Sequence, residues 1–154
     1  MSGVGRIGTI VAVCVSERKG EGKRDVGEGM LLEGFGLEGD AHGGDWHRQV
    51  SLLSKASIEE MRRKGFDVGP GDFAENLTVE GLDVWGLPVG TRLRVGLNAL
   101  LEVTQIGKEC HTGCAVFKAT GSCIMPKQGV FARVIKGGPV RKGDIVRVVD
   151  DDKE

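Results

Sequence analysis

Glycine is the residue type that most constrains how this chain can fold. The sequence holds 26 glycines among 154 residues, well above the usual share of about 7%. They separate short stretches of aliphatic and β-branched residues, a spacing typical of many short strands joined by tight turns. We therefore expect a largely antiparallel sheet whose strands are Ile7–Ser16, Val50–Ser54, Asn76–Val79, Thr91–Val95, Leu100–Ile106 and Ile145–Val149.

Only two segments have the residue spacing of a helix. The first runs from Lys55 to about Lys64, with Ser54 as its N-cap and Gly65 as its stop. The second, which we expect to be a short helix although its β-branched residues also suit a strand, is Val130–Lys136. Many short strands with little helix predict a mainly β fold, either a barrel or a sandwich.

Length and charge limit the class of protein. A chain of 154 residues has the usual size of one domain, so we expect residues 1–154 to form a single domain. The formal net charge of −1 gives no indication of nucleic-acid binding. The apolar stretch Ile7–Val15 is too short to span a bilayer and lacks the order of a signal peptide. We expect a cytoplasmic protein with neither a membrane nor a nucleic acid as partner.

Residues 34–39 match the spaced glycines of the dinucleotide-binding fingerprint. That fingerprint works only where it opens a helix whose N-terminus receives the pyrophosphate. Here Gly39 leads into Asp40 and further glycines, which do not predict a helix. We therefore expect no nucleotide binding through this segment.

Two imidazoles and one guanidinium lie close together just ahead of the strand expected at Val50–Ser54. They belong to His42, His47 and Arg48. Arg48 could bind a phosphate or carboxylate through paired N–H donors, and His42 could donate a hydrogen bond, accept one or ligate a metal. The alternative is a structural role, in which Asp40 caps a turn and the histidines satisfy buried backbone groups.

The four cysteines fall into two groups. Cys14 lies alone in the first apolar stretch, and we expect it in the core, since free cysteine packs as a small hydrophobe. Cys110, Cys114 and Cys123 lie within a short segment. In a reducing compartment this clustering favours chemistry or metal binding over disulfides.

Cys110 is the strongest candidate for a chemically active residue. Lys108 and His111 flank it, and their positive charge would stabilise the thiolate and lower the pKa of the thiol below its usual value near about 8.5. We expect Cys110 to act as a nucleophile or persulfide carrier, with His111 beside it as the second catalytic residue.

Other interpretations of the cysteine segment stay open. Cys110 could be an inert thiol in a glycine-rich turn. A zinc site could draw on four residues of the segment, with His42 nearby, although the spacing is not that of paired zinc knuckles: Cys110, His111, Cys114 and Cys123. Two of the thiols could also form a reversible disulfide and act as a redox switch.

Several short motifs follow one another along the chain: Gly39–His42, Arg48–Leu53, Gly71–Thr78, Leu87–Gly90, Leu101–Thr104, Cys110, Gly129–Val134 and Gly143–Asp144. Taken in this order, over about residues 6–149, they resemble a MOSC domain, the domain found at the C-terminus of molybdenum cofactor sulfurases. The segments Gly107–Cys114 and Ile124–Pro126 are similar to the compact MOSC proteins associated with molybdenum cofactor biosynthesis. Glu109 departs from the pattern, because many relatives have proline there.

The resemblance implies a closed, mostly antiparallel β-barrel with a few short helices. It further implies a pocket for the molybdenum cofactor (molybdopterin), in which Cys110 carries sulfur or binds molybdenum; pyridoxal phosphate binding is another property found within the family. Because the cofactor is an anionic pterin phosphate, cations should line its pocket. The expected cofactor contacts are His42, Arg48, Lys108, Cys114, Lys127 and Arg133.

Two functional hypotheses follow from these residues. The first is a protein of molybdenum cofactor metabolism that binds the cofactor or its precursor, or carries sulfur on Cys110, with a cysteine desulfurase or cofactor-assembly protein as partner. The second is a non-enzymatic module that holds zinc or a regulatory disulfide. Either protein could be a monomer or a homodimer. Asp40 and Asn76 are expected to hold loops through side-chain to backbone hydrogen bonds.

Overall fold

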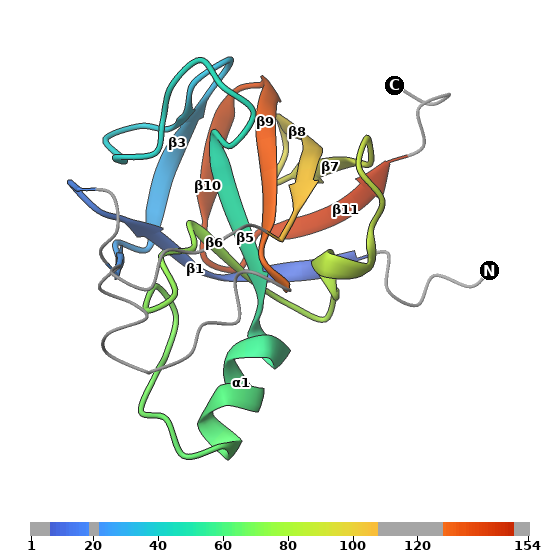
Figure 1. Ribbon diagram of the computed structural model, residues 1–154. Helices are drawn as coiled ribbons and strands as arrows, with labels where there is room; N and C mark the ends of the chain where they lie inside the picture. Colours follow the sequence, from blue (N-terminus) through green and yellow to red (C-terminus); the bar gives the residue numbers. More distant parts are fainter. Residues whose placement is uncertain (1–6, 19–21, 108–127, 150–154) are drawn as a thin grey trace.

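The structure is a computed structural model that describes residues 7–18, 22–107 and 128–149. Seven strands close into a barrel in which each is hydrogen-bonded to two neighbours (Figure 1). In order around the barrel they are β1 (Ile7–Val15), β6 (Leu77–Glu80), β5 (Val50–Ser54), β9 (Val130–Lys136), β8 (Ala99–Ile106), β7 (Arg92–Val95) and β11 (Ile145–Val149). The expected mainly β, closed-barrel fold is confirmed.

Strand β1 closes the barrel because it pairs with strands from both ends of the sheet. Its first residues pair with β11, with Gly8 opposite Val146, and its later residues pair with β6. The register shifts between Ile10 and Ala12, and such an irregularity bends a strand and increases its twist. Because of this bend, β1 can pair first with β11 and then with β6.

The barrel is antiparallel except at one pair. β5 and β6 run parallel, with Leu52 opposite Leu77, and parallel neighbours need a long crossover connection. Helix α1 (Lys55–Arg63) lies within that crossover and continues directly from the end of β5 (Figure 1). Helix α1 thus accounts for the single parallel pair in an otherwise antiparallel barrel.

The predicted helix is confirmed, but its N-cap residue has another role. Lys64 is the C-cap and Gly65 has a φ of 102°, the left-handed conformation that commonly ends a helix. Ser54 occupies the N-cap position without a side-chain capping bond. Its Oγ donates to the carbonyl of Leu82 instead and accepts from the amide of Val84, at 2.9 and 3.1 Å. Ser54 therefore ties β5 to the short 3₁₀ helix η1 (Val84–Gly86).

The helix expected at Val130–Lys136 is wrong, because this segment is strand β9. Its residues alternate between two environments, as the pleat of a strand requires. Val130, Ala132 and Val134 face the interior of the barrel, and Phe131 packs against the second apolar cluster beside α1. Pairing with both β5 and β8 outweighed the helical spacing of its apolar residues.

Short elements complete the fold. β2 (Arg24–Asp25) pairs with the end of β1. A small three-stranded sheet lies beside the barrel and consists of β10 (Gly138–Arg141), β3 (Glu28–Leu32) and β4 (Gly36–Leu37). β4 lies inside the glycine-spaced segment 34–39, which opens no helix, as expected.

Two apolar clusters stabilise the fold. The larger fills the barrel, and the smaller lies between α1 and the barrel wall, with Ile58, Met61 and Phe131 among its members. Cys14 is fully buried in strand β1, as expected. Burial raises the pKa of its thiol, and the negative charges of Glu75 and Asp25 add to that effect, so Cys14 is held as an unreactive thiol. Within the described residues, none of the helices has the length and apolarity needed to cross a membrane.

Candidate functional site

The loop between β4 and β5 carries the first group of predicted site residues. Asp40 is buried and holds the start of this loop against β1, because its Oδ1 accepts from the amide of Ser16 at 3.0 Å. Its Oδ2 accepts from the amide of His42 at 3.1 Å. These side-chain to backbone bonds confirm the role expected for Asp40.

Asn76 makes similar side-chain to backbone bonds, and its side chain also hydrogen-bonds Asp40. Its side-chain oxygen accepts from the amide of Ser51 at 2.8 Å, and its side-chain nitrogen donates to the carbonyl of Cys14 at 3.0 Å. One amide thereby fixes β1 to β5, and the expected structural role of Asn76 is confirmed.

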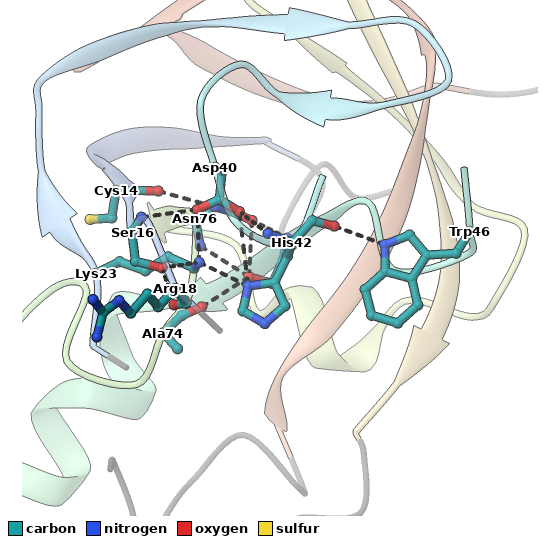
Figure 2. Close-up of polar contacts among 10 residues, drawn as sticks. Cys14, Ser16, Arg18, Lys23, Asp40, His42, Trp46, Ala74 and Asn76 are labelled. Atoms are coloured by element: carbon teal, nitrogen blue, oxygen red, sulfur yellow. Dashed lines mark hydrogen bonds and ion pairs between the residues drawn. The ribbon is translucent and has the colours of Figure 1, made fainter. Parts of the chain in front are cut away.

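A buried lysine joins Asp40 to His42 (Figure 2). The side chain of Lys23 has no exposed surface, and its Nζ lies 2.7 Å from Oδ1 of Asp40. The same nitrogen lies 2.9 Å from Nδ1 of His42 and 2.9 Å from Oγ of Ser16. Lys23 was not among the predicted site residues.

The charges of this pair set the protonation of its members. Burial alone would raise the pKa of the Asp40 carboxyl, but the hydrogen bond and charge of Lys23 outweigh it and hold that pKa below its usual 3.8. Burial lowers the pKa of the Lys23 ammonium, against the opposing effect of its bond to Asp40. Removal of either partner would leave the other as an unpaired buried charge, which is strongly destabilising.

Arg48 lies between two aromatic rings at the far end of the same loop. Its guanidinium carbon is 4.7 Å from the centre of the Trp46 ring and 5.6 Å from that of Phe131 in β9. Such stacking orients a guanidinium through cation–π attraction. Its Nε is buried and has no hydrogen-bond partner among the described residues. Arg48 therefore keeps one N–H donor that the described part of the protein does not satisfy.

Trp46 connects His42, near the start of the loop, to Arg48, near its end. Its ring stacks on Arg48, and its Nε1 donates to the carbonyl of His42 at 2.8 Å (Figure 2). The loop is thus fixed internally from His42 to Arg48, both of which were predicted site residues.

The loop also reaches the point where the cysteine segment begins. Nε2 of His47 lies 2.7 Å from Oε1 of Gln105, near the end of β8, and Nε2 of Gln105 donates to the carbonyl of Gly107 at 2.7 Å. Thr104 donates a hydrogen bond to the carbonyl of His47. The amide of Gly107 donates in turn to the carbonyl of Gly129, at 2.7 Å. The structure therefore brings the histidine-containing loop next to both ends of the segment that carries Cys110.

Arg133 differs from Arg48 because it is already engaged. It lies on β9, and its Nε and Nη2 donate to Oε1 of Glu102 at 2.9 and 2.6 Å, with about half of the Arg133 side chain exposed. The pair borders a groove of about 520 Å³ between the loop and the barrel wall. The groove is also lined by Trp46, His47 and Thr104.

The remaining predicted site residues lie outside the described residues. They are Lys108, Cys110, His111, Cys114 and Lys127, together with Cys123 from the zinc and disulfide alternatives. Within residues 7–18, 22–107 and 128–149, no group of three or more histidine, cysteine, aspartate or glutamate side chains could hold a metal ion.

The residue types of the loop mark it in the sequence, but nothing comparable marks Lys23. Lys23 lies in a charged, glycine-rich stretch that resembles a solvated turn. A buried lysine is rare unless it is paired, and its partner Asp40 lies far along the chain. The one available signal was the need of a buried Asp40 for a counter-ion.

The described residues define a class of small, closed, mixed β-barrels with a polar loop packed against the barrel wall. Residues 38–147 match the MOSC domain family, and the chain belongs to that family.

Three solved structures share this fold. The YuaD protein from Bacillus subtilis is 20% identical, with a TM-score of 0.77, over 92% of this chain and 95% of that one. YiiM from Geobacillus stearothermophilus is 20% identical, with a TM-score of 0.69, over 93% of this chain and 75% of that one. YiiM from Escherichia coli is 24% identical, with a TM-score of 0.68, over 94% and 70% of the two chains. No protein of curated function matches the chain in sequence.

Proposed function

We propose that this MOSC protein acts in molybdenum cofactor metabolism, where it binds the cofactor or a sulfur-loaded precursor through Cys110. Family membership supports the class of ligand. The observation that carries the proposal furthest is the Arg48 guanidinium, which has a buried Nε without a partner among the described residues and belongs to the loop that reaches Gly107.

The residues of the loop fit an anionic pterin ligand. A guanidinium held by two aromatic rings is a preorganised donor for a phosphate, and Trp46 supplies an aromatic surface next to it. Arg133 contributes less, because Glu102 already neutralises it. Arg48 is therefore the cation we assign to the ligand among the described residues, with Lys108 and Lys127 as further proposed contacts.

Sulfur loading needs only a thiolate and a persulfide donor. The Cys110 thiolate would attack the terminal sulfur of a desulfurase persulfide, forming one S–S bond while the donor's S–S bond breaks. The electron pair leaves with the desulfurase thiolate, so no external oxidant or reductant is required. His111 and Lys108 would stabilise the attacking anion.

Mass spectrometry after incubation with a cysteine desulfurase and cysteine tests this function. We expect one added sulfur atom on the peptide that contains Cys110, and none after Cys110→Ser. Cys14→Ser is the matched control, because that thiol is buried and should not affect loading. Equal loading of the Cys110→Ser variant would refute the proposal.

Elemental analysis separates this function from the alternative module. If Cys110 and its neighbours hold zinc, purified protein should contain one zinc per chain and resist loading. A thiol count before and after reductant would identify a regulatory disulfide in the same sample.

A further inference from the structure

With Lys23 as an ammonium, the hydrogen bonds around it leave one arrangement of protons. An ammonium has three N–H donors and accepts none, and Lys23 has three partners: Oγ of Ser16, Oδ1 of Asp40 and Nδ1 of His42. The hydroxyl of Ser16 donates to the carbonyl of Arg18 at 3.0 Å, so its oxygen is left to accept from Lys23. Each of the three donors is therefore assigned to one acceptor.

The protonation of His42 follows from this assignment. Asp40 is an ionised carboxylate, and its hydrogen bond and negative charge favour the ammonium form of Lys23. Nδ1 of His42 must then present a lone pair to the third N–H. A neutral imidazole has one protonated nitrogen, and since it is not Nδ1, it is Nε2.

We propose that Lys23 is a positioning residue that holds His42 as its Nε2–H tautomer and thereby keeps His42 from acting as a metal ligand. Lys23 touches no ligand itself. It acts through the ring of His42, whose side chain is 23% exposed, while Lys23 and Asp40 are completely covered.

The tautomer bears directly on the zinc alternative. A histidine binds a metal through a nitrogen lone pair. In this network the lone pair on Nδ1 is occupied by Lys23, and Nε2 carries hydrogen. Zinc binding by His42 would require the loss of its bond to a buried ammonium, so we expect no contribution from His42 to a zinc site.

Nitrogen-15 NMR of histidine-labelled protein measures the tautomer without any cofactor. The chain has three histidines, and His42→Gln identifies the signals of His42 by their loss. We expect an unprotonated, hydrogen-bonded Nδ1 and a protonated Nε2 near neutral pH. A protonated Nδ1, or a ring protonated at both nitrogens, would overturn the inference.

A pair of variants tests whether Lys23 is the cause. Lys23→Met combined with Asp40→Asn removes both buried charges, which is tolerated better than an unpaired carboxylate. Without the Lys23 donor, we expect part of the protein to carry the ring proton on Nδ1. In the rest, the signal of the unprotonated Nδ1 should be that of a nitrogen that accepts no hydrogen bond. Lys55→Met, at an exposed lysine paired with Glu80, is the matched control and should leave the wild-type pattern. An unchanged pattern in the double variant would show that Lys23 does not position the ring.

Zinc added to wild-type protein gives a second readout. The His42 signals should stay in place on addition of Zn²⁺, and a shift of Nε2 to a metal-bound nitrogen would contradict the inference. Because none of these measurements uses sulfur loading, failed loading of Cys110 with an intact Nε2–H tautomer would refute only the proposed function.

Discussion

At the scale of single residues, the fold depends on the buried ion pair between Lys23 and Asp40. Lys23 and Asp40 both lack exposed side-chain surface, and neither would be stable there alone. Their pairing fixes the turn of β1 at Ser16, the start of the loop and the ring of His42. Burial of a pair from distant parts of the chain is a tertiary property, which local sequence patterns do not report.

Removal of one member of the pair should be costly. We expect Asp40→Asn to lower the free energy of unfolding by about 3–5 kcal/mol, the usual cost of leaving a buried charge unpaired. Glu102→Gln, which breaks the exposed pair with Arg133, should cost less than about 1 kcal/mol. Urea denaturation measures both, and equal effects would show that the Lys23–Asp40 pair has no special role.

The same carboxylate predicts a pH dependence. The folded-state pKa of Asp40 lies below its usual 3.8, so around that pH the native state binds fewer protons than the unfolded chain. The stability it contributes is complete above that pH and is lost as the pH falls through the folded-state pKa. The difference in unfolding free energy between wild type and Asp40→Asn should therefore be constant near neutral pH and shrink in acid. A difference that grows in acid would contradict this sign.

At the scale of elements, six of the seven barrel strands could be predicted, whereas β2, β3, β4 and β10 could not. Periodicity and β-branched residues identified β1, β5, β6, β7, β8 and β11 to within one or two residues. β2 and β4 have two residues each, too few to show a period. In β9, Phe131, Val134 and Ile135 fit a helical spacing and therefore predicted a helix. The strand is apolar on both faces because one face lies in the barrel core and the other packs against the apolar cluster beside α1.

In the candidate site, the loop residues could be predicted from the sequence and their contacts could not. The motif residues of the loop were found from their types, since two imidazoles and a guanidinium close together are unusual. Their partners were not, because Gln105 and Phe131 are distant in sequence from His47 and Arg48 and become neighbours only when β8 and β9 pair. The roles proposed for Cys110 and His111 stay predictions.

The turn at Gly71 should tolerate no side chain. Its φ is 89°, and a Cβ there would lie 2.1 Å from the carbonyl oxygen of Lys23, so Gly71→Ala must displace the backbone at Lys23. Gly65 has a φ of 102° with no atom near its Cβ position, so Gly65→Ala should cost only the backbone strain, about 1–2 kcal/mol. Thermal unfolding should rank Gly71→Ala well below Gly65→Ala; similar values would contradict the close approach.

At the scale of the whole molecule, stability depends on closing the ring of strands. Val146 is fully buried in β11 and pairs with Gly8 and Val95, whereas its neighbour Arg147 is exposed. We expect Val146→Asp to abolish cooperative unfolding, because a charge would enter the barrel without a partner. Arg147→Asp should change the free energy of unfolding by no more than about 0.5 kcal/mol. Circular dichroism during heating distinguishes the two, and a cooperative transition in Val146→Asp would show that the barrel closes by other means.

The pairing of β1 with β11 also places the start of the first barrel strand beside the last barrel strand. Ile7 lies opposite Arg147, so a short glycine-rich linker could join the start of β1 to the end of β11 without crossing the barrel. New termini could then be opened at Leu97, which is 92% exposed in the tight turn between β7 and β8. A rearranged chain of this kind would keep every strand neighbour while changing the order in which the strands are synthesised.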